Sequence, residues 1–158
     1  MSGRGLVKAM TRTGEYREDW ETPSRIFDPL NEEFRFGLDV CATPENSKCW
    51  HHFTKEDDAL SREWRVQHFA EYRPWWMNPP YGRDVIPLWV EKAHQEAQAG
   101  RWGVALLPCY TGNGWWLDIV MQYEVRFVRK KIHFVGAKHN AAFWNAVVVF
   151  RGSGERQP

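Results

Sequence analysis

The chain has 158 residues, a net charge of +1 at pH 7 and three cysteines. This length predicts one domain with a single core, which we place at residues 18–151 between a flexible arm (1–17) and a flexible tail (152–158). No stretch approaches 18 apolar residues, so no membrane span is expected, and the N-terminus lacks the apolar segment of a secretory signal. An odd number of cysteines without framework spacing indicates a reducing, cytoplasmic setting.

Charge is distributed unevenly along the chain. Acidic residues outnumber basic ones within residues 14–63, whereas basic residues dominate residues 125–158. A basic end suits a polyanionic partner, and ordinary solvated charge explains it about equally well. The chain also contains ten tryptophans. Most of them are expected in the core, but single-stranded or flipped bases stack on the same rings.

The first predicted element is a helix that begins near Thr22. Thr22 is a suitable N-cap, with Pro23 at the first helical position. Apolar residues then recur at helical spacing, at Ile26, Phe27, Leu30 and Phe34. This pattern predicts an amphipathic helix.

Two strands are expected next, within residues 36–42 and 48–54. The loop after the first strand contains Cys41 and Ala42 and no glycine. Cys49, His51 and His52 lie near Cys41 in sequence, but their spacing fits no zinc pattern, so no metal site is expected.

Three acids, Glu56, Asp57 and Asp58, follow the second predicted strand. A carboxylate in this place can accept hydrogen bonds from ribose hydroxyls or an adenine amine. Alternatively, the acids begin a helix over residues 59–64. The span between Val40 and Trp75 is short for two strand–helix units. We therefore expect the third strand, whose candidate is residues 66–69, to be reduced or absent.

The tetrapeptide Asn78-Pro79-Pro80-Tyr81 follows an apolar aromatic run and precedes Gly82, which predicts a strand end that turns into a loop. The prolines carry no N–H, so the backbone presents carbonyl acceptors only. Asn78 adds a carbonyl oxygen and Tyr81 a flat ring. Acceptors outside the plane of an aromatic amine favour a tetrahedral nitrogen whose lone pair can attack an electrophile such as a methyl sulfonium. A proline turn that merely caps a core strand is the alternative.

The second half of the chain alternates between helical and extended patterns. We expect helices over 84–99 and 115–123, and strands over 103–108, 124–128 and 141–150, with a loop at 111–114. The strand that ends at the tetrapeptide, the helix 84–99 and the strand 103–108 form a right-handed βαβ unit.

The tetrapeptide resembles the (Asp/Asn/Ser)-Pro-Pro-(Tyr/Phe/Trp) motif of S-adenosylmethionine-dependent amino methyltransferases. The wider pattern is similar to the small phage-type DNA N6-adenine methyltransferases over most of the chain. The matching pieces are Trp20-Glu21-Thr22-Pro23, Leu38-Asp39-Val40-Cys41-Ala42-Thr43, Glu56-Asp57-Asp58-Ala59-Leu60 with Trp64, the tetrapeptide, and Leu106-Leu107-Pro108 with Trp115-Trp116. The resemblance implies a Rossmann-like α/β fold with a mostly parallel sheet and an antiparallel final strand.

The resemblance also implies site residues. The catalytic pocket for a flipped adenine is formed by Asn78, Pro79, Pro80 and Tyr81. S-adenosyl-L-methionine is held by Thr22, Pro23, Asp39, Val40, Cys41, Ala42 and Asp58, with Asp57 as a close alternative to Asp58. Double-stranded DNA contacts Arg129, Lys130, Lys131 and Lys138. Of Phe143 and Trp144, one ring clamps the flipped base opposite Tyr81 and the other faces the core.

Other functions share these features. The same tetrapeptide occurs in methyltransferases of protein glutamine and of RNA guanine. The glycine-poor loop after Asp39 leaves open a tryptophan-rich nucleic-acid-binding module without a cofactor. The chain has no room for a separate target-recognition domain, so DNA sequence would be read by loops, by the arm or by a second subunit in a dimer.

Overall fold

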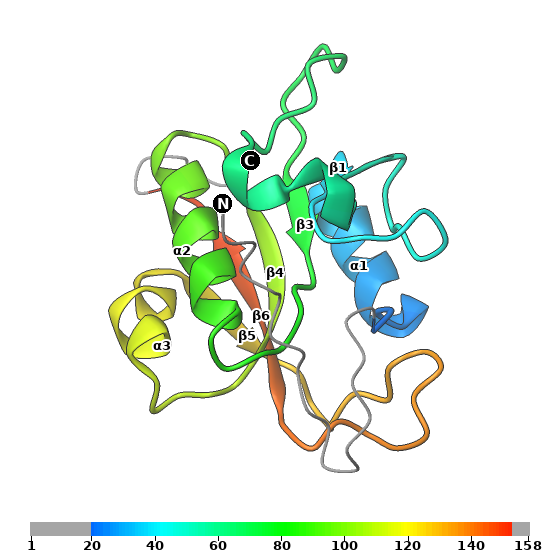
Figure 1. Ribbon diagram of the computed structural model, residues 1–158, viewed down its shortest axis with the longest axis vertical. Helices are drawn as coiled ribbons and strands as arrows, with labels where there is room; N and C mark the ends of the chain where they lie inside the picture. Colours follow the sequence, from blue (N-terminus) through cyan, green and yellow to red (C-terminus); the bar gives the residue numbers. More distant parts are fainter. Residues whose placement is uncertain (1–19, 153–158) are drawn as a thin grey trace, which may run out of the picture.

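The computed structural model describes residues 20–152 and contains one six-stranded sheet (Figure 1). The arm predicted for residues 1–17 and the tail beyond Gly152 lie outside the described residues. The strands are β1 (Leu38–Asp39), β2 (His51–His52), β3 (Trp75–Met77), β4 (Gly103–Pro108), β5 (Glu124–Phe127) and β6 (Asn145–Phe150). Their order is β2-β1-β3-β4-β6-β5. In this sheet, β6 runs in the direction opposite to that of the other five strands. This confirms the Rossmann-like α/β fold and the antiparallel final strand.

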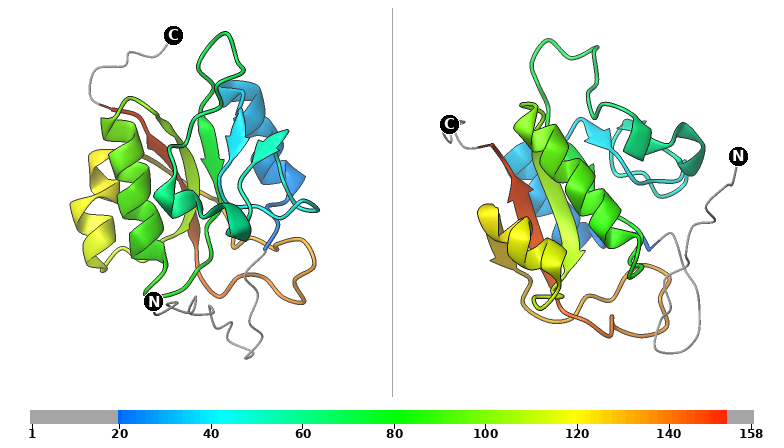
Figure 2. Two further views of the ribbon diagram at one scale, coloured as in Figure 1. Left: turned by 45° about the horizontal axis from the view of Figure 1, so that its top comes forward. Right: turned by 60° about the vertical axis from the view of Figure 1, so that its left-hand side comes forward.

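Helices cover both faces of the sheet (Figure 2). The helix α1 (Ser24–Phe34) packs on one face, and α2 (Ile86–Gln98) and the short α3 (Gly114–Asp118) pack on the other. Side chains alternate along β4, so that Val104 and Leu106 join the α1 core while Ala105 and Leu107 join the α2 core. Both faces of β4 and β6 are therefore buried, which explains why their sequences are continuously apolar.

The predicted boundaries of α2 agree with the structure, whereas the predicted start of α1 does not. In α2, Pro87 lies in the first turn, and Gly100 follows the helix with a φ of 79°, as expected. In α1, the prediction that Thr22 is the N-cap is wrong. Pro23 holds that position in an extended conformation, and no side chain caps the helix. The Thr22 hydroxyl is buried and makes no hydrogen bond to the helix.

The region between β2 and β3 differs from the predicted helix over 59–64. Residues 53–74 contain no strand and no α-helix, only 3₁₀ turns at Lys55–Asp57 and Ala59–Ser61. Ala59 O accepts from Arg62 N at 3.3 Å, which closes a 3₁₀ turn, and it also accepts from the Trp64 indole at 2.8 Å. The absence of a third strand in residues 53–74 agrees with the short span noted above.

The boundaries of two further elements differ from the predicted ones. The last strand begins at Asn145, not Ala141, because the Ala141 amide turns back to Ile132 O at 2.8 Å. The helix predicted over 115–123 is divided into α3 and a 3₁₀ turn at Val120–Gln122.

The pairing of β3 with β4 depends on one residue without a side chain. Gly103 lies opposite Trp75, and a Cβ on Gly103 would overlap the Trp75 ring and its backbone oxygen. Backbone cannot retreat as a flexible side chain can, so the substitution Gly103→Ala must shift the two central strands apart.

We expect Gly103→Ala to lower the free energy of unfolding by about 2–3 kcal/mol in urea titrations, the usual cost of overpacking a core. Gly112→Ala is the matched control, because a Cβ there meets no atom within 4 Å. Equal stability of the two variants would show that β3 and β4 tolerate wider spacing.

Candidate functional site

The carboxyl ends of β1 and β3 lie beside the start of α1. Asp39 ends β1 and Asn78 follows β3, so these predicted site residues share one edge of the sheet. Figure 1 shows that the connection between β5 and β6, drawn in orange, passes below the start of α1 at the same edge. Ligands of open α/β sheets bind at this edge.

Asn78 is oriented by a contact with the distant Trp20. Its Nδ2 donates to Trp20 O at 2.7 Å, across 58 positions of sequence. This bond fixes which end of the amide faces away from Trp20. Among residues 20–152, no donor is bonded to Asn78 Oδ1, so this oxygen remains available as an acceptor.

Tyr81 is anchored by its hydroxyl to the centre of the sheet. The hydroxyl donates to Leu106 O at 2.9 Å and accepts from Asn145 Nδ2 at 3.2 Å. Burial raises the pKa of Tyr81 well above its usual value, so the phenol is neutral. The ring is half-buried, and Phe143 meets it edge-on at a centroid distance of 5.2 Å.

Further aromatic rings lie beside Tyr81 and Phe143, and the sequence patterns had not assigned these rings to the site. Trp20 stacks on Phe134 at 5.1 Å and on Phe143 at 6.1 Å, and Tyr110 meets Phe143 edge-on at 5.9 Å. Trp20 contacts Asn78 through its backbone carbonyl, which every residue type carries. The identity of the Trp20 side chain therefore could not have predicted this hydrogen bond.

The segment at the start of α1 contains an unsatisfied polar group. Thr22 is only 2% exposed, and its hydroxyl has no hydrogen-bond partner among the described residues. The Ile26 and Phe27 amides both donate to Pro23 O, which leaves the Ser24 and Arg25 amides without an intrahelical acceptor. A buried hydroxyl beside a helix N-terminus is suited to a carboxylate.

The loop after β1 contains no glycine, and hydrogen bonds to the Asp39 carboxylate determine its shape. Asp39 is buried, its Oδ1 accepts from Cys41 N at 3.2 Å, and its Oδ2 accepts from Lys48 N at 3.0 Å. Ala42 N in turn donates to Phe53 O at 3.0 Å. The Asp39 carboxylate thus closes the loop on itself, while Val40, Cys41 and Ala42 follow it at the sheet edge.

Asp57 and Asp58 have different environments. Asp57 Oδ2 accepts from Thr54 N at 2.8 Å and from Thr54 Oγ1 at 3.1 Å, which completes a capping box. These bonds, with the backbone donor the larger cause, lower the pKa of Asp57. Asp58 is exposed and left-handed, with a φ of 50°. Asp57 is therefore committed to its own turn, and Asp58 presents its carboxylate to solvent.

The predicted DNA-contacting residues lie on the connection between β5 and β6. Arg129, Lys130 and Lys138 are exposed. Lys131 Nζ donates to Ala142 O at 3.3 Å and lies 5.6 Å from the centre of the Trp144 ring.

Phe143 and Trp144 lie in different environments, and the assignment of one of them to a flipped base stays a prediction. Phe143 faces Tyr81, whereas Trp144 is 55% exposed. The Trp144 carbonyl accepts from Cys109 N at 2.8 Å, so the loop after β4 holds this backbone in place.

Within residues 20–152, no group of His, Cys, Asp and Glu has a geometry that would hold a metal ion. Over the same residues, none of the helices combines the length and the apolar character that a bilayer span requires.

Comparison with known proteins matches this arrangement to one family. The family model described as "DNA N-6-adenine-methyltransferase (Dam)" matches residues 9–149. A curated relative described as "Putative methyltransferase YfdM", from Escherichia coli (strain K12), is 38% identical over 69 residues. That alignment covers 42% of this chain and 75% of the relative. The family match includes the start of α1, the tetrapeptide and the basic connection.

The buried Asp39 predicts a pH dependence of stability. Burial raises the pKa of Asp39 from 3.8 to about 6. Between these values the folded protein binds one more proton than the unfolded chain. The free energy of unfolding therefore falls as the pH rises through this window, by about 3 kcal/mol from this group. Urea titrations from pH 4 to 7 on the parent and on Asp39→Asn measure the difference. Parallel curves for the two proteins would contradict this assignment.

Proposed function

Because this chain belongs to the Dam family of DNA N6-adenine methyltransferases, we propose that it transfers a methyl group from S-adenosylmethionine to N6 of an adenine flipped out of duplex DNA. The orientation of Asn78 carries the proposal. Its Nδ2 is occupied by Trp20 O, so Oδ1 is the end that faces a ligand. The two prolines that follow add carbonyl acceptors without donors.

Asn78 and Pro79 act on the target amine by accepting its N–H groups. Acceptors outside the ring plane draw the nitrogen toward a tetrahedral form and free its lone pair. An amide is not a base at neutral pH, so Asn78 does not remove the proton, which leaves to solvent after transfer. Catalysis then depends on positioning and hydrogen bonding. Tyr81 supplies the ring face for the adenine, and Phe143 borders the pocket beside it.

The chain has residues that fit the cofactor. The Thr22 hydroxyl, unpartnered among the described residues, suits the carboxylate of the methionine end together with Pro23 and the amides of the first turn of α1 that have no intrahelical acceptor. The loop of Asp39, Val40, Cys41 and Ala42 borders the same edge of the sheet. Asp58 is preferred over Asp57 for the ribose hydroxyls, because its carboxylate is not used in a capping box. S-adenosylmethionine supplies the electrophilic methyl group.

DNA is proposed to approach the basic connection between β5 and β6. Arg129, Lys130, Lys131 and Lys138 supply positive charge there without a nearby acid in sequence. Trp144 adds an exposed ring next to Phe143, so an aromatic surface continues from the pocket toward the charged loop. Phosphate contacts would fix the duplex, and the rings would receive the unstacked base.

The test of the reaction is incubation of the purified protein with tritiated S-adenosylmethionine and duplex DNA, followed by nucleoside analysis. We expect N6-methyl-2′-deoxyadenosine from the parent, a turnover lower by about 10²–10³ for Asn78→Ala, and cofactor affinity within a few-fold. Asn78→Asp should be intermediate, because it keeps an acceptor oxygen but loses the bond to Trp20 O. Unchanged turnover by Asn78→Ala would remove Asn78 from the mechanism.

The DNA surface is tested through salt dependence. The double substitution Arg129→Gln/Lys130→Gln should weaken binding to any DNA sequence and flatten the slope of log affinity against log salt by about 1–2 units, because fewer counterions are released. The control is Arg65→Gln/Arg73→Gln on the segment 62–73, which lies at the opposite end of the molecule (Figure 1). If both double variants retain the parent slope, DNA binds elsewhere.

A further inference from the structure

The segment that carries Asp58 lacks the usual means of holding a residue in place. Residues 53–74 form no strand and no α-helix, so no hydrogen-bond ladder fixes them. Asp58 itself has a φ of 50°, a conformation that L-residues other than asparagine and aspartate rarely adopt. Local hydrogen bonds hold its backbone: Asp58 N donates to Lys55 O at 3.3 Å, and Asp58 O accepts from Ser61 N at 3.0 Å and from Ser61 Oγ at 2.9 Å. These bonds define the turn itself, and a contact from another part of the chain attaches the turn to the core.

Trp64 makes the contact that attaches the turn to the core. Its Nε1 donates to Ala59 O at 2.8 Å, one peptide after Asp58, and its ring is 1% exposed. The ring packs edge-on against Trp75 of β3 at 4.9 Å. The 3₁₀ turn after Asp58 is thus connected through the Trp64 indole to the central sheet.

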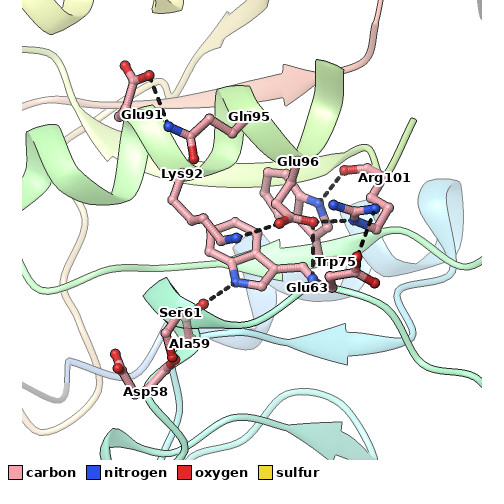
Figure 3. Close-up of polar contacts among 11 residues, drawn as sticks. Asp58, Ala59, Ser61, Glu63, Trp75, Glu91, Lys92, Gln95, Glu96 and Arg101 are labelled. Atoms are coloured by element: carbon pink, nitrogen blue, oxygen red, sulfur yellow. Dashed lines mark hydrogen bonds and ion pairs between the residues drawn. The ribbon is translucent and has the colours of Figure 1, made fainter. Parts of the chain in front are cut away.

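Trp64 is in turn held by a buried carboxylate on α2. Glu96 Oε2 accepts from Trp64 N at 3.1 Å, and Oε1 accepts from Lys92 Nζ at 2.6 Å. Arg101 also donates to Oε2, as Figure 3 shows. Burial alone would raise the pKa of Glu96, but these three donors lower it below its usual value, so the acceptor stays ionised.

We infer that Trp64, anchored by Glu96, is a positioning residue that sets Asp58 for the cofactor ribose. The inference depends on the proposed function, in which Asp58 accepts from the ribose hydroxyls. The indole N–H acts through Ala59 O and not by touching the ligand. Replacing Trp64 by phenylalanine removes this donor and reduces the size of the buried ring.

Trp89 offers a matched control in the same core. Its ring lies 6.1 Å from that of Trp64, and its Nε1 is buried without a hydrogen-bond partner among the described residues. Both Trp64→Phe and Trp89→Phe shrink a buried indole, so both should lower the melting temperature. Only Trp64→Phe removes a hydrogen bond to the turn that follows Asp58.

The experiment measures the dissociation constant of S-adenosylmethionine by calorimetry on the full chain. We expect Trp64→Phe to weaken binding by about 3- to 10-fold, the effect of one hydrogen bond, and Trp89→Phe to leave it within 2-fold. Asp58→Gly removes the carboxylate and accepts the φ of 50° without strain. In the Asp58→Gly background, Trp64→Phe should cause no further loss.

Each other outcome has a defined meaning. If Asp58→Gly weakens binding but Trp64→Phe does not, the positioning role is overturned and the proposed function stands. The role is also overturned if the two losses multiply in the double variant. If Asp58→Gly binds as the parent does, the assignment of Asp58 fails, and the inference fails with it. Should Trp64→Phe not fold, Glu96→Gln tests the same chain of contacts with the same expected loss and the same non-additivity with Asp58→Gly.

Discussion

The hydrogen bond from Asn78 Nδ2 to Trp20 O connects the two ends of the site. One end is the tetrapeptide at the end of β3, and the other is the start of α1, where the Thr22 hydroxyl has no partner within residues 20–152. Because the same bond orients the acceptor oxygen of Asn78, the proposed methyl acceptor and methyl donor sites share one structural constraint. The ring of Trp20 extends this constraint to the basic connection by stacking on Phe134.

Side chains replace regular secondary structure on the β1 side of the sheet. Asp39 closes the loop after β1, Asp57 caps a single turn, and Trp64 with Glu96 fixes the segment before β3. In a larger Rossmann-like sheet, crossover helices perform this task. A short chain can therefore keep the carboxyl edge of its sheet ordered by using a few buried polar contacts, each of which must be fully satisfied.

The sequence predicted those elements whose signals are local. The helical spacing of α2, the apolar run of β4 and the loop after β3 were confirmed, and so were the mostly parallel sheet and the antiparallel final strand that the family resemblance implies. The failures were at positions where a distant partner decides the local structure. Thr22 resembles an N-cap but is buried at the site edge, and residues 59–64 have helical composition but form only a 3₁₀ turn, whose Ala59 carbonyl also accepts from the distant Trp64 indole. Asp58 and Asp57 are indistinguishable in sequence, and only the capping box separates them.

The open edge of the sheet at β2 has a consequence for solubility. A strand edge with unpaired backbone groups can recruit a second chain and start aggregation. Here the missing third strand leaves β2 as the edge, but β2 is only His51–His52. The ring of His51 is also covered by His68 and Phe69, at centroid distances of 6.3 and 5.4 Å. Two residues offer too short a template for another strand, so the truncation limits edge-to-edge pairing at β2.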